Sequence, residues 1–317
     1  MDLPSVAIVI PTRNRHQLLK RCLHRLIAYI GAHPECSIVV SDDGNASETR
    51  EVLNEEFGIV AVIQGPHQGP AANRNCGASH STGDLIVFLD DDCIPSENLI
   101  GSYQEAAMRN PEIGVFEGRI SAKGELSSFA DAFVTNETGG YLWSCNFAIR
   151  RELFLKVKGF DPRYPFAAME DVDLHQRIKS LSAVPFLPDA LVWHEIERRI
   201  GWRVVQHHAL SVLLFLHIHG PKATDKSPLY FLHQAARNLV WRGGLHLWKR
   251  NMKDPGQLAF QIWESLQLGL IVSFWSFHTL LARKFYPPCC SGCDSIHSFM
   301  AGSDHSPIVA EKSTNPH

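Results

Sequence analysis

The sequence predicts an α/β protein built on an open, mostly parallel β-sheet with helices on both faces. Between residues 5 and 95, short apolar runs rich in β-branched residues alternate with segments in which apolar residues recur at helical spacing. The runs are apolar throughout, as in Val6–Ile10, which is typical of strands covered on both faces. Because ligands of such sheets bind beyond the carboxyl ends of the strands, the polar residues at those ends are candidates for a site.

The first half of the chain contains the most regular of these elements. Strands are expected at Val6–Ile10, Ser37–Ser41, Val60–Ile63 and Leu85–Leu89. Helices are expected between them, over residues 18–30, Ser47–Phe57 and Ala71–Ser79. Polar groups follow three of the strands, namely Thr12, Asp42 and Asp90–Asp92.

The second half is less regular, and its character changes near residue 201. Further strands are expected at Val115–Ile120, Leu142–Ile149 and Ala190–Trp193, and further helices at Arg150–Val157 and Asp171–Leu181. The later segments Val204–His219 and Pro255–Phe285 are long, apolar and helical in pattern. We therefore expect an α/β domain over residues 1–200, a helical region over 201–286 and a tail without stable structure over 287–317.

The composition excludes several classes of protein. Hydrophobic residues make up 45% of the 317 residues and charged residues 20%, which is typical of a globular chain rather than a disordered or fibrous one. The net charge of -3 gives no reason to expect a nucleic-acid partner. The 8 cysteines are not spaced as a disulfide framework, and Met1–Ser5 does not begin a recognisable signal peptide. We expect a cytoplasmic protein that folds in a reducing compartment.

Asp90, Asp91 and Asp92 follow the apolar run Leu85–Leu89. Three adjacent carboxylates repel one another, so their placement at a sheet edge favours a bound cation. Mg²⁺ and Mn²⁺ take such oxygen ligands, often together with phosphate oxygens of a substrate. The alternative is a solvated turn that caps the next helix.

A second acidic cluster, Glu170-Asp171-Val172-Asp173, is expected to begin a helix. The helix dipole favours an ionised carboxylate there, which suits a general base that accepts a proton from a hydroxyl. The alternative is an ordinary acidic helix start. His194 follows a predicted strand, although a chain with 17 histidines also places some of them for purely structural reasons.

Motifs with recognisable chemistry follow one another over residues 5–195. In chain order they are Pro11-Thr12-Arg13-Asn14, Ser41-Asp42-Asp43-Gly44, Ala72-Asn73-Arg74-Asn75-Cys76-Gly77, Phe88-Leu89-Asp90-Asp91-Asp92, Gly159-Phe160-Asp161, Glu170-Asp171-Val172-Asp173-Leu174 and Val192-Trp193-His194. This order closely resembles family 2 glycosyltransferases. The resemblance implies a GT-A fold, a nucleotide-diphosphate sugar as donor, Mn²⁺ or Mg²⁺ as cofactor, and inversion at the anomeric carbon of the sugar.

The resemblance also assigns roles on the donor side of the site. Pro11, Thr12 and Arg13 match residues that line the nucleotide pocket. Asp42 matches a residue that hydrogen-bonds the base, and Arg74 one that lies near the nucleotide or its phosphates.

Further roles concern the metal, the sugar and the acceptor. Asp92 and Asp90 match the metal ligands, with Asp92 the direct one, and Asp90 and Asp91 also belong to the segment that contacts the ribose or the sugar. The other residues assigned by the resemblance are His194 at the metal or diphosphate, Trp143 and Asn146 near the donor sugar and acceptor, Asp171 as catalytic base, and Glu170 beside it.

One departure from the family bears on the product. Processive polysaccharide synthases of the family carry a Gln-x-x-Arg-Trp element after the Glu-Asp motif, whereas this chain has Arg198-Arg199-Ile200-Gly201-Trp202-Arg203 in that region. The departure favours transfer of one sugar per binding event to a hydroxyl of a glycan, a lipid-linked or another acceptor. A nucleotidylyltransferase-like enzyme is an alternative, but the glycine-free Pro11–Asn14 segment disfavours it. A non-catalytic nucleotide-sugar-binding relative is disfavoured by the presence of both acidic clusters.

The apolar run Leu266–Ala282 has three interpretations. The first is a membrane span, but the run is short for one and contains several polar residues. Basic residues flank it on both sides, so their distribution does not indicate an orientation in the membrane. A helix in the membrane interface, contributed by residues 258–285, fits this pattern and would place the protein peripherally on the cytoplasmic face of a membrane. A buried helix or an oligomer contact is the third interpretation.

Three thiols lie close together near the C-terminus, at Cys289, Cys290 and Cys293. A zinc site would need a fourth ligand, for which His297 is the nearby candidate. A cysteine-rich tail without a metal is the simpler interpretation.

Overall fold

The computed structural model describes residues 3–31, 33, 35–54, 56–124, 131–132, 134–198 and 202–220, together with residues 233, 262–263, 266–267 and 269–270. The chain separates into two compact units, residues 1–275 and 276–317, and the second unit lies outside the described residues. The domain boundary expected near residue 201 falls on residues that are not described, so it stays a prediction.

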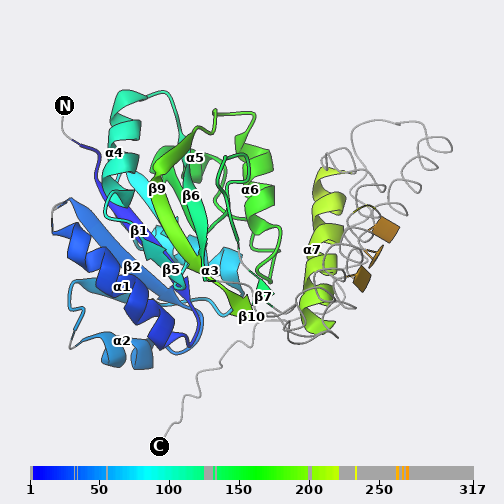
Figure 1. Ribbon diagram of the computed structural model, residues 1–317, viewed down its shortest axis with the longest axis horizontal. Helices are drawn as coiled ribbons and strands as arrows, with labels where there is room; N and C mark the ends of the chain where they lie inside the picture. Colours follow the sequence, from blue (N-terminus) through cyan, green and yellow to red (C-terminus); the bar gives the residue numbers. More distant parts are fainter. Residues whose placement is uncertain are drawn as a thin grey trace, which may run out of the picture. The chain divides into compact units, whose positions relative to one another are not determined.

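The described residues form an alternating series of strands and helices (Figure 1). In chain order the elements are β1 (Val6–Thr12), α1 (His16–Ile30), β2 (Cys36–Asp42), α2 (Ala46–Asn54), β3 (Val60–Gln64), α3 (Pro70–Ser79), β4 (Leu85–Leu89), β5 (Cys93–Pro95), α4 (Leu99–Arg109), β6 (Val115–Lys123), β7 (Asp131–Ala132), β8 (Asn146–Arg150), α5 (Arg151–Lys156), α6 (Glu170–Ile178), β9 (Phe186–Glu195), β10 (Glu197–Arg198) and α7 (Trp202–His219).

The main sheet has 8 strands in the order β3-β2-β1-β4-β8-β6-β9-β5. The strands β3, β2, β1 and β4 are parallel to one another, as the β-α-β pattern of the first half predicts. β8 runs antiparallel to both β4 and β6, β9 is parallel to β6, and β5 is antiparallel to β9. The sheet is therefore mixed, with its parallel half formed by the first four long strands.

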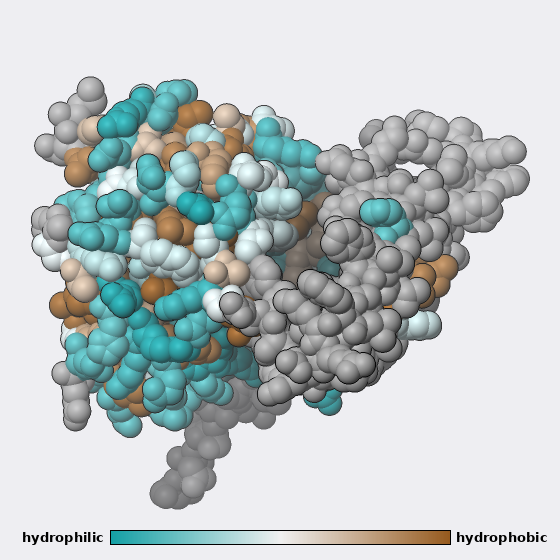
Figure 2. Space-filling model, viewed as in Figure 1, coloured by the Kyte–Doolittle hydropathy of each residue, from teal (hydrophilic) through white to brown (hydrophobic). Residues whose placement is uncertain are grey.

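Helices cover both faces of this sheet, which explains why its central strands are apolar throughout (Figure 1). In β1, Ile8 and Ile10 pack on the face that α1, α2 and α4 cover. Val9, between them, points to the other face and packs with residues of α3, α5 and α6. This alternation follows from the two-residue period of a strand. Figure 2 shows the outer surface, where hydrophobic residues of the described part are scattered among hydrophilic ones.

The strand expected at Leu142–Ile149 begins only at Asn146. The preceding backbone is held by Glu117, a fully buried residue of β6. Its carboxylate accepts hydrogen bonds from the backbone N–H groups of Gly140, Tyr141 and Leu142 and from the side chain of Asn136, all at 2.7 Å. These N–H groups are then not available to a strand ladder, so the segment forms a loop instead.

Helix α7 confirms the helix expected at Val204–His219, and its contacts join it to α6. Phe215 packs in the same core as Leu174, and His219 Nε2 lies 2.6 Å from the Asp173 carboxylate. Among the described residues, no helix is both long and apolar enough to cross a membrane. Most of the segment 258–285 and the whole tail with Cys289 lie outside the described residues, so their predicted roles are untested.

We predict that Glu117→Gln weakens the fold through the loop of residues 136–142. The amide can accept fewer of the four hydrogen bonds than the carboxylate, and its NH₂ group faces a backbone donor. The free energy of unfolding should fall by about 1.5–3 kcal/mol, the contribution of one hydrogen bond to a charged group. Urea denaturation measures this change, with the exposed Glu112→Gln as the matched control. Equal stability of both variants would show that the carboxylate does not hold the loop.

Candidate active site

The carboxyl ends of three neighbouring parallel strands bring the first set of predicted residues together. Thr12, at the end of β1, pairs in register with Asp42, at the end of β2. The Thr12 hydroxyl donates a hydrogen bond of 2.6 Å to Asp91, which follows β4. Pro11 is half-buried beside Thr12, whereas Arg13 is exposed. The edge of the sheet predicted from sequence therefore carries the expected polar residues.

The loop after β2 is ordered by two buried aspartates. Asp42 accepts hydrogen bonds from the Gly44 backbone and the Thr49 hydroxyl. Asp43 accepts from the backbone N–H groups of His67 and Gly69 and so fixes the loop before α3. Its contribution was missed because these partners lie more than twenty residues away, where no local motif reveals them.

Arg74, on α3, joins the two acidic clusters. Its guanidinium donates to Asp90 Oδ1 at 2.7 Å and to Glu170 Oε1 at 3.1 Å, although Glu170 lies 96 positions further along the chain. The side chain is only 4% exposed, and its guanidinium carbon lies 5.6 Å from the centre of the Phe160 ring. Burial acts to lower the pKa of Arg74, but the two carboxylates outweigh it and raise the pKa, so the charge is kept.

Arg15 neutralises the other two aspartates of the first cluster. It lies 3.1 Å from Asp91 Oδ1 and 2.8 Å from Asp92 Oδ2, just before α1 begins. Burial nevertheless raises the pKa of Asp91 to about 7, against the opposing effects of Arg15 and the Thr12 hydroxyl. Sequence reasoning missed Arg15, although its position two residues after Arg13 in the first motif was the available signal.

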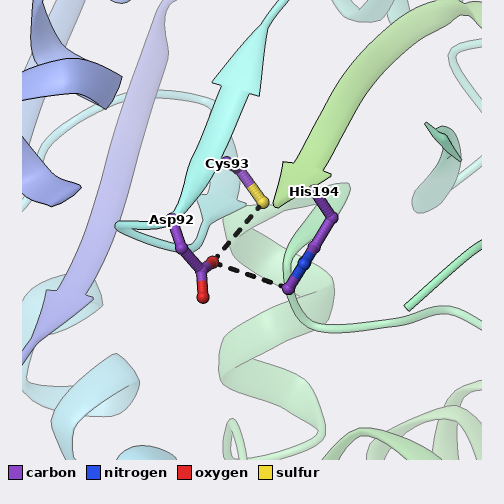
Figure 3. A group of neighbouring side chains, drawn as sticks. All are labelled: Asp92, Cys93 and His194. Carbon is purple, nitrogen blue, oxygen red and sulfur yellow. Dashed lines mark hydrogen bonds and ion pairs between the residues drawn. The ribbon is translucent and has the colours of Figure 1, made fainter. Parts of the chain in front are cut away.

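Asp92 and His194 form the part of the site that suits a metal ion (Figure 3). His194 Nε2 lies 3.5 Å from Asp92 Oδ1, and the thiol of Cys93 completes a group of three buried side chains. His194 Nδ1 lies 2.8 Å from the backbone oxygen of Glu195, which can only accept, so Nδ1 carries the proton. In the neutral imidazole, the lone pair of Nε2 then faces a carboxylate oxygen. A cation between the two atoms satisfies both, as is usual for histidine ligands of metals.

The predicted metal ligands are thus brought together in part. Asp92 and His194 lie side by side, whereas Asp90 forms its ion pair with Arg74 and is not a member of this group within the described residues. Oxygen and imidazole donors fit Mn²⁺, and Mg²⁺ is compatible with the carboxylate.

The second acidic cluster begins α6, as predicted, and both of its first residues are buried. Asp171 Oδ2 lies 3.4 Å from the backbone N–H of Ser144, and Asp171 Oδ1 accepts from the N–H of Val172. Burial raises the pKa of Asp171, and it raises the pKa of Glu170 to about 8 with a further contribution from the Asp171 charge. The expectation that the helix dipole keeps these carboxylates readily ionised was therefore wrong. Loss of hydration outweighs the dipole.

The segment near Ser144 contains the two remaining predicted residues. Trp143 is partly buried and stacks on Tyr141, with ring centroids 5.4 Å apart and planes 5° from parallel. Asn146 is fully buried. Its side-chain NH₂ group donates to the backbone oxygens of Arg119 and Ala190, and its Oδ1 accepts a hydrogen bond from the Tyr103 hydroxyl. These bonds give Asn146 a part in the sheet, while its predicted contact with a donor sugar stays untested.

The arrangement as a whole combines two chemical capacities at one sheet edge. Asp92 and His194 can hold a divalent cation, and the buried Asp171 can accept a proton. Arg74 places a fixed positive charge between the two acidic clusters. A displacement reaction with an anionic leaving group needs positive charge near the leaving group and a base near the attacking group, and these residues can supply both.

Comparison with known proteins gives a consistent result. Residues 7–158 match the model of the family described as glycosyl transferase family 2. The probable glycosyltransferase YdaM of Bacillus subtilis is 23% identical over 228 residues, covering 64% of this chain and 54% of YdaM. The validoxylamine A glucosyltransferase of Streptomyces hygroscopicus subsp. limoneus is 25% identical over 217 residues, covering 56% and 48%. The chain thus spans about half the length of these curated relatives.

A shorter match has a lipid-linked acceptor in its name. It is the GalNAc(5)-diNAcBac-PP-undecaprenol beta-1,3-glucosyltransferase of Campylobacter jejuni, which is 28% identical over 95 residues, covering 28% of this chain and 30% of the relative.

Two solved structures share the fold. The mannosyltransferase PcManGT of Pyrobaculum calidifontis, in complex with GDP-Man and Mn²⁺, has a TM-score of 0.53 and 15% identity, covering 90% of this chain and 88% of that one. GalNAc-T7 with UDP, GalNAc and Mn²⁺ has a TM-score of 0.52 and 19% identity, covering 63% and 44%. The predicted GT-A fold is confirmed. The fold, the family model matched over residues 7–158 and the curated relatives agree, and all of them make this chain similar to glycosyl transferase family 2.

Proposed function

We propose that this chain is a metal-dependent, inverting glycosyltransferase that moves a single sugar from a nucleotide-diphosphate sugar to an acceptor hydroxyl. The observation that carries the proposal is that the Arg74 guanidinium donates hydrogen bonds to both Asp90 and Glu170. It brings the acidic cluster suited to the donor and the cluster suited to the base into one site, although they are far apart in the sequence. The match to the family model supports the same activity, as do the GDP-Man bound in one structural neighbour and the UDP and GalNAc bound in the other.

On the donor side, the ends of β1 and β2 would hold the nucleotide, with Asp42 near the base. Asp92 and His194 would hold Mn²⁺ or Mg²⁺, which supplies positive charge to the diphosphate as it leaves. Arg74 adds a second positive charge, and its burial makes that charge more effective because water screens it little.

On the acceptor side, Asp171 would be the general base. A hydroxyl has a pKa far above 7, so a carboxylate must accept its proton as the new C–O bond forms. Arg74 donates a hydrogen bond to Glu170 Oε1, whereas the hydrogen bonds of Asp171 come from the backbone N–H groups of Ser144 and Val172. We therefore assign proton transfer to Asp171 and orientation of Arg74 to Glu170.

Inversion follows from this division of roles. The hydroxyl oxygen attacks the anomeric carbon from the face opposite the diphosphate, so one displacement inverts the configuration. The acceptor is proposed to be a glycan or a lipid-linked hydroxyl, in line with the Campylobacter jejuni relative. The peripheral membrane contact through residues 258–285 stays a prediction.

We predict that Asp92→Asn abolishes metal-dependent binding of the donor nucleotide. The amide keeps the size of the side chain but removes the charge that attracts the cation. A ligand that binds only the folded state raises the melting temperature, so a panel of nucleoside diphosphates with and without Mn²⁺ gives the readout. The exposed Asp189→Asn is the matched control. An Asp92→Asn variant with an unchanged Mn²⁺-dependent shift would exclude Asp92 as the metal ligand.

We predict that Asp171→Asn separates binding from chemistry. Transfer should fall by about 10²–10⁴-fold, the usual contribution of a positioned base. The affinity for the donor should stay roughly constant, because the base acts on the acceptor. Glu170→Gln should have a milder effect on transfer. Rates of sugar transfer and donor binding are compared for both variants. If Asp171→Asn transferred sugar at nearly the wild-type rate and Glu170→Gln were inactive, Glu170 would be the base and Asp171 would not.

The raised pKa of Glu170 predicts a stability that falls as the pH rises. In the unfolded chain this carboxyl loses its proton near its ordinary pKa of 4.5, whereas the folded protein holds the proton up to about pH 8. Between these values the folded state binds more protons, so the stabilisation present below pH 4.5 is lost toward pH 8. In Glu170→Gln, the free energy of unfolding should fall less steeply between pH 4.5 and pH 8. Urea denaturation at several pH values tests this, and a slope unchanged from wild type would contradict the shift.

A further inference from the structure

We propose that Asp92, Cys93 and His194 together form a site for a thiophilic divalent cation such as Zn²⁺, with the Cys93 sulfur as a third protein ligand. This inference goes beyond sugar transfer. It concerns a ligand that the transfer reaction does not use, and it depends only on the geometry of three side chains (Figure 3).

The three potential ligand atoms are close to the spacing that zinc requires. Asp92 Oδ1 lies 3.5 Å from His194 Nε2 and 3.9 Å from Cys93 Sγ, and all three atoms lie within 4.8 Å of one another. Zinc bonds of about 2.0 Å to oxygen and nitrogen and about 2.3 Å to sulfur, at tetrahedral angles, place ligand atoms roughly 3.3–3.6 Å apart. The oxygen–nitrogen pair already has this spacing, and the sulfur would have to move closer to both partners for the group to close around an ion.

The backbone fixes two of these ligands against each other. Cys93 is the first residue of β5, and it pairs in register with His194 on the antiparallel strand β9. Directly opposed residues of antiparallel strands carry their side chains on the same face, with Cβ atoms about 4.5–5.5 Å apart. All three side chains are buried, and the strand pairing sets the positions of Cys93 and His194.

The hydrogen bonds of the group also suit a metal. His194 donates through Nδ1 to the Glu195 backbone oxygen, which leaves Nε2 to coordinate. The Cys93 thiol donates only long contacts, 3.9 Å to Asp92 and 3.8 Å to the backbone oxygen of Cys145. When the ion binds, the S–H bond breaks, a zinc–sulfur bond forms, and the proton passes to water.

The third ligand distinguishes one class of ion from another. Mn²⁺ and Mg²⁺ favour oxygen donors, so their binding depends little on a thiol. Zn²⁺ and Cd²⁺ bind thiolate strongly and gain a ligand that the harder ions leave unused. Because Asp92 and His194 are common to both, a thiophilic ion in this site would displace Mn²⁺.

The test uses Cd²⁺, because a cadmium–thiolate bond gives an ultraviolet charge-transfer band. The full-length chain carries Cys289→Ser, Cys290→Ser and Cys293→Ser, so that the thiols of the tail do not contribute. We expect one equivalent of Cd²⁺ to produce the band, and Zn²⁺ to remove it by competition. Cys93→Ser should abolish the band and weaken Zn²⁺ binding by about tenfold or more. Cys36→Ser, at the start of β2, is the matched control and should keep the band.

Binding of Mn²⁺, followed by electron paramagnetic resonance, separates this inference from the proposed function. Mn²⁺ binding should be unchanged in Cys93→Ser and should be lost from the parent protein as Zn²⁺ is added. If Mn²⁺ binds but Cd²⁺ gives no band, the thiophilic site is excluded while the transfer site stands. A band that persists in Cys93→Ser and disappears in Cys145→Ser would also overturn the proposal, because the ion would then use the neighbouring thiol. Cys93→Ala serves in place of Cys93→Ser if the serine variant does not fold.

Discussion

The buried guanidinium of Arg74 is the interaction on which the rest of the site depends. Five carboxylates, those of Asp90, Asp91, Asp92, Glu170 and Asp171, are gathered at one edge of the sheet, and their mutual repulsion opposes folding. Arg74 lies between the two clusters and bonds one member of each. Removing one partner of such a buried ion pair typically costs about 3–5 kcal/mol, because the remaining charges lose their compensation without regaining water. The ion pairs therefore join α3, the end of β4 and the start of α6 into one unit.

The sequence predicted the parallel half of the fold closely and the second half less well. Leu85–Leu89 matches β4 residue for residue, because a strand buried on both faces is apolar along its whole length. The strand does not begin at Leu142 as expected, because the backbone N–H of Leu142 donates its hydrogen bond to Glu117, 25 positions away, and not to a neighbouring strand. Local patterns do not reveal partners of that kind.

The same limit applies to the candidate site. The motifs located the acidic clusters, but Arg15 and Asp43 act through contacts with distant residues. The cysteine spacing excluded a disulfide framework but did not single out Cys93, although its place directly after Asp92 is the signal that it lies beside the site. The helix dipole misled the prediction for Glu170 and Asp171, since the sequence does not show how deeply a side chain is buried. Active-site carboxylates whose burial costs stability are common in enzymes, because a raised pKa is often what their chemistry requires.

Helix α6 has only nine residues, and two side-chain contacts hold its first turn. Glu170 contacts Arg74, and Asp173, three residues further along the same turn, contacts His219 of α7. Two contacts on neighbouring positions of one turn restrict how far the start of the helix can shift or rotate. The position of the proposed base is therefore inherited from the helix rather than from its own few hydrogen bonds, and α7, which lies beyond the matched family segment, shares in setting it. The precision of the reaction would then depend in part on a helix that supplies none of the proposed catalytic residues.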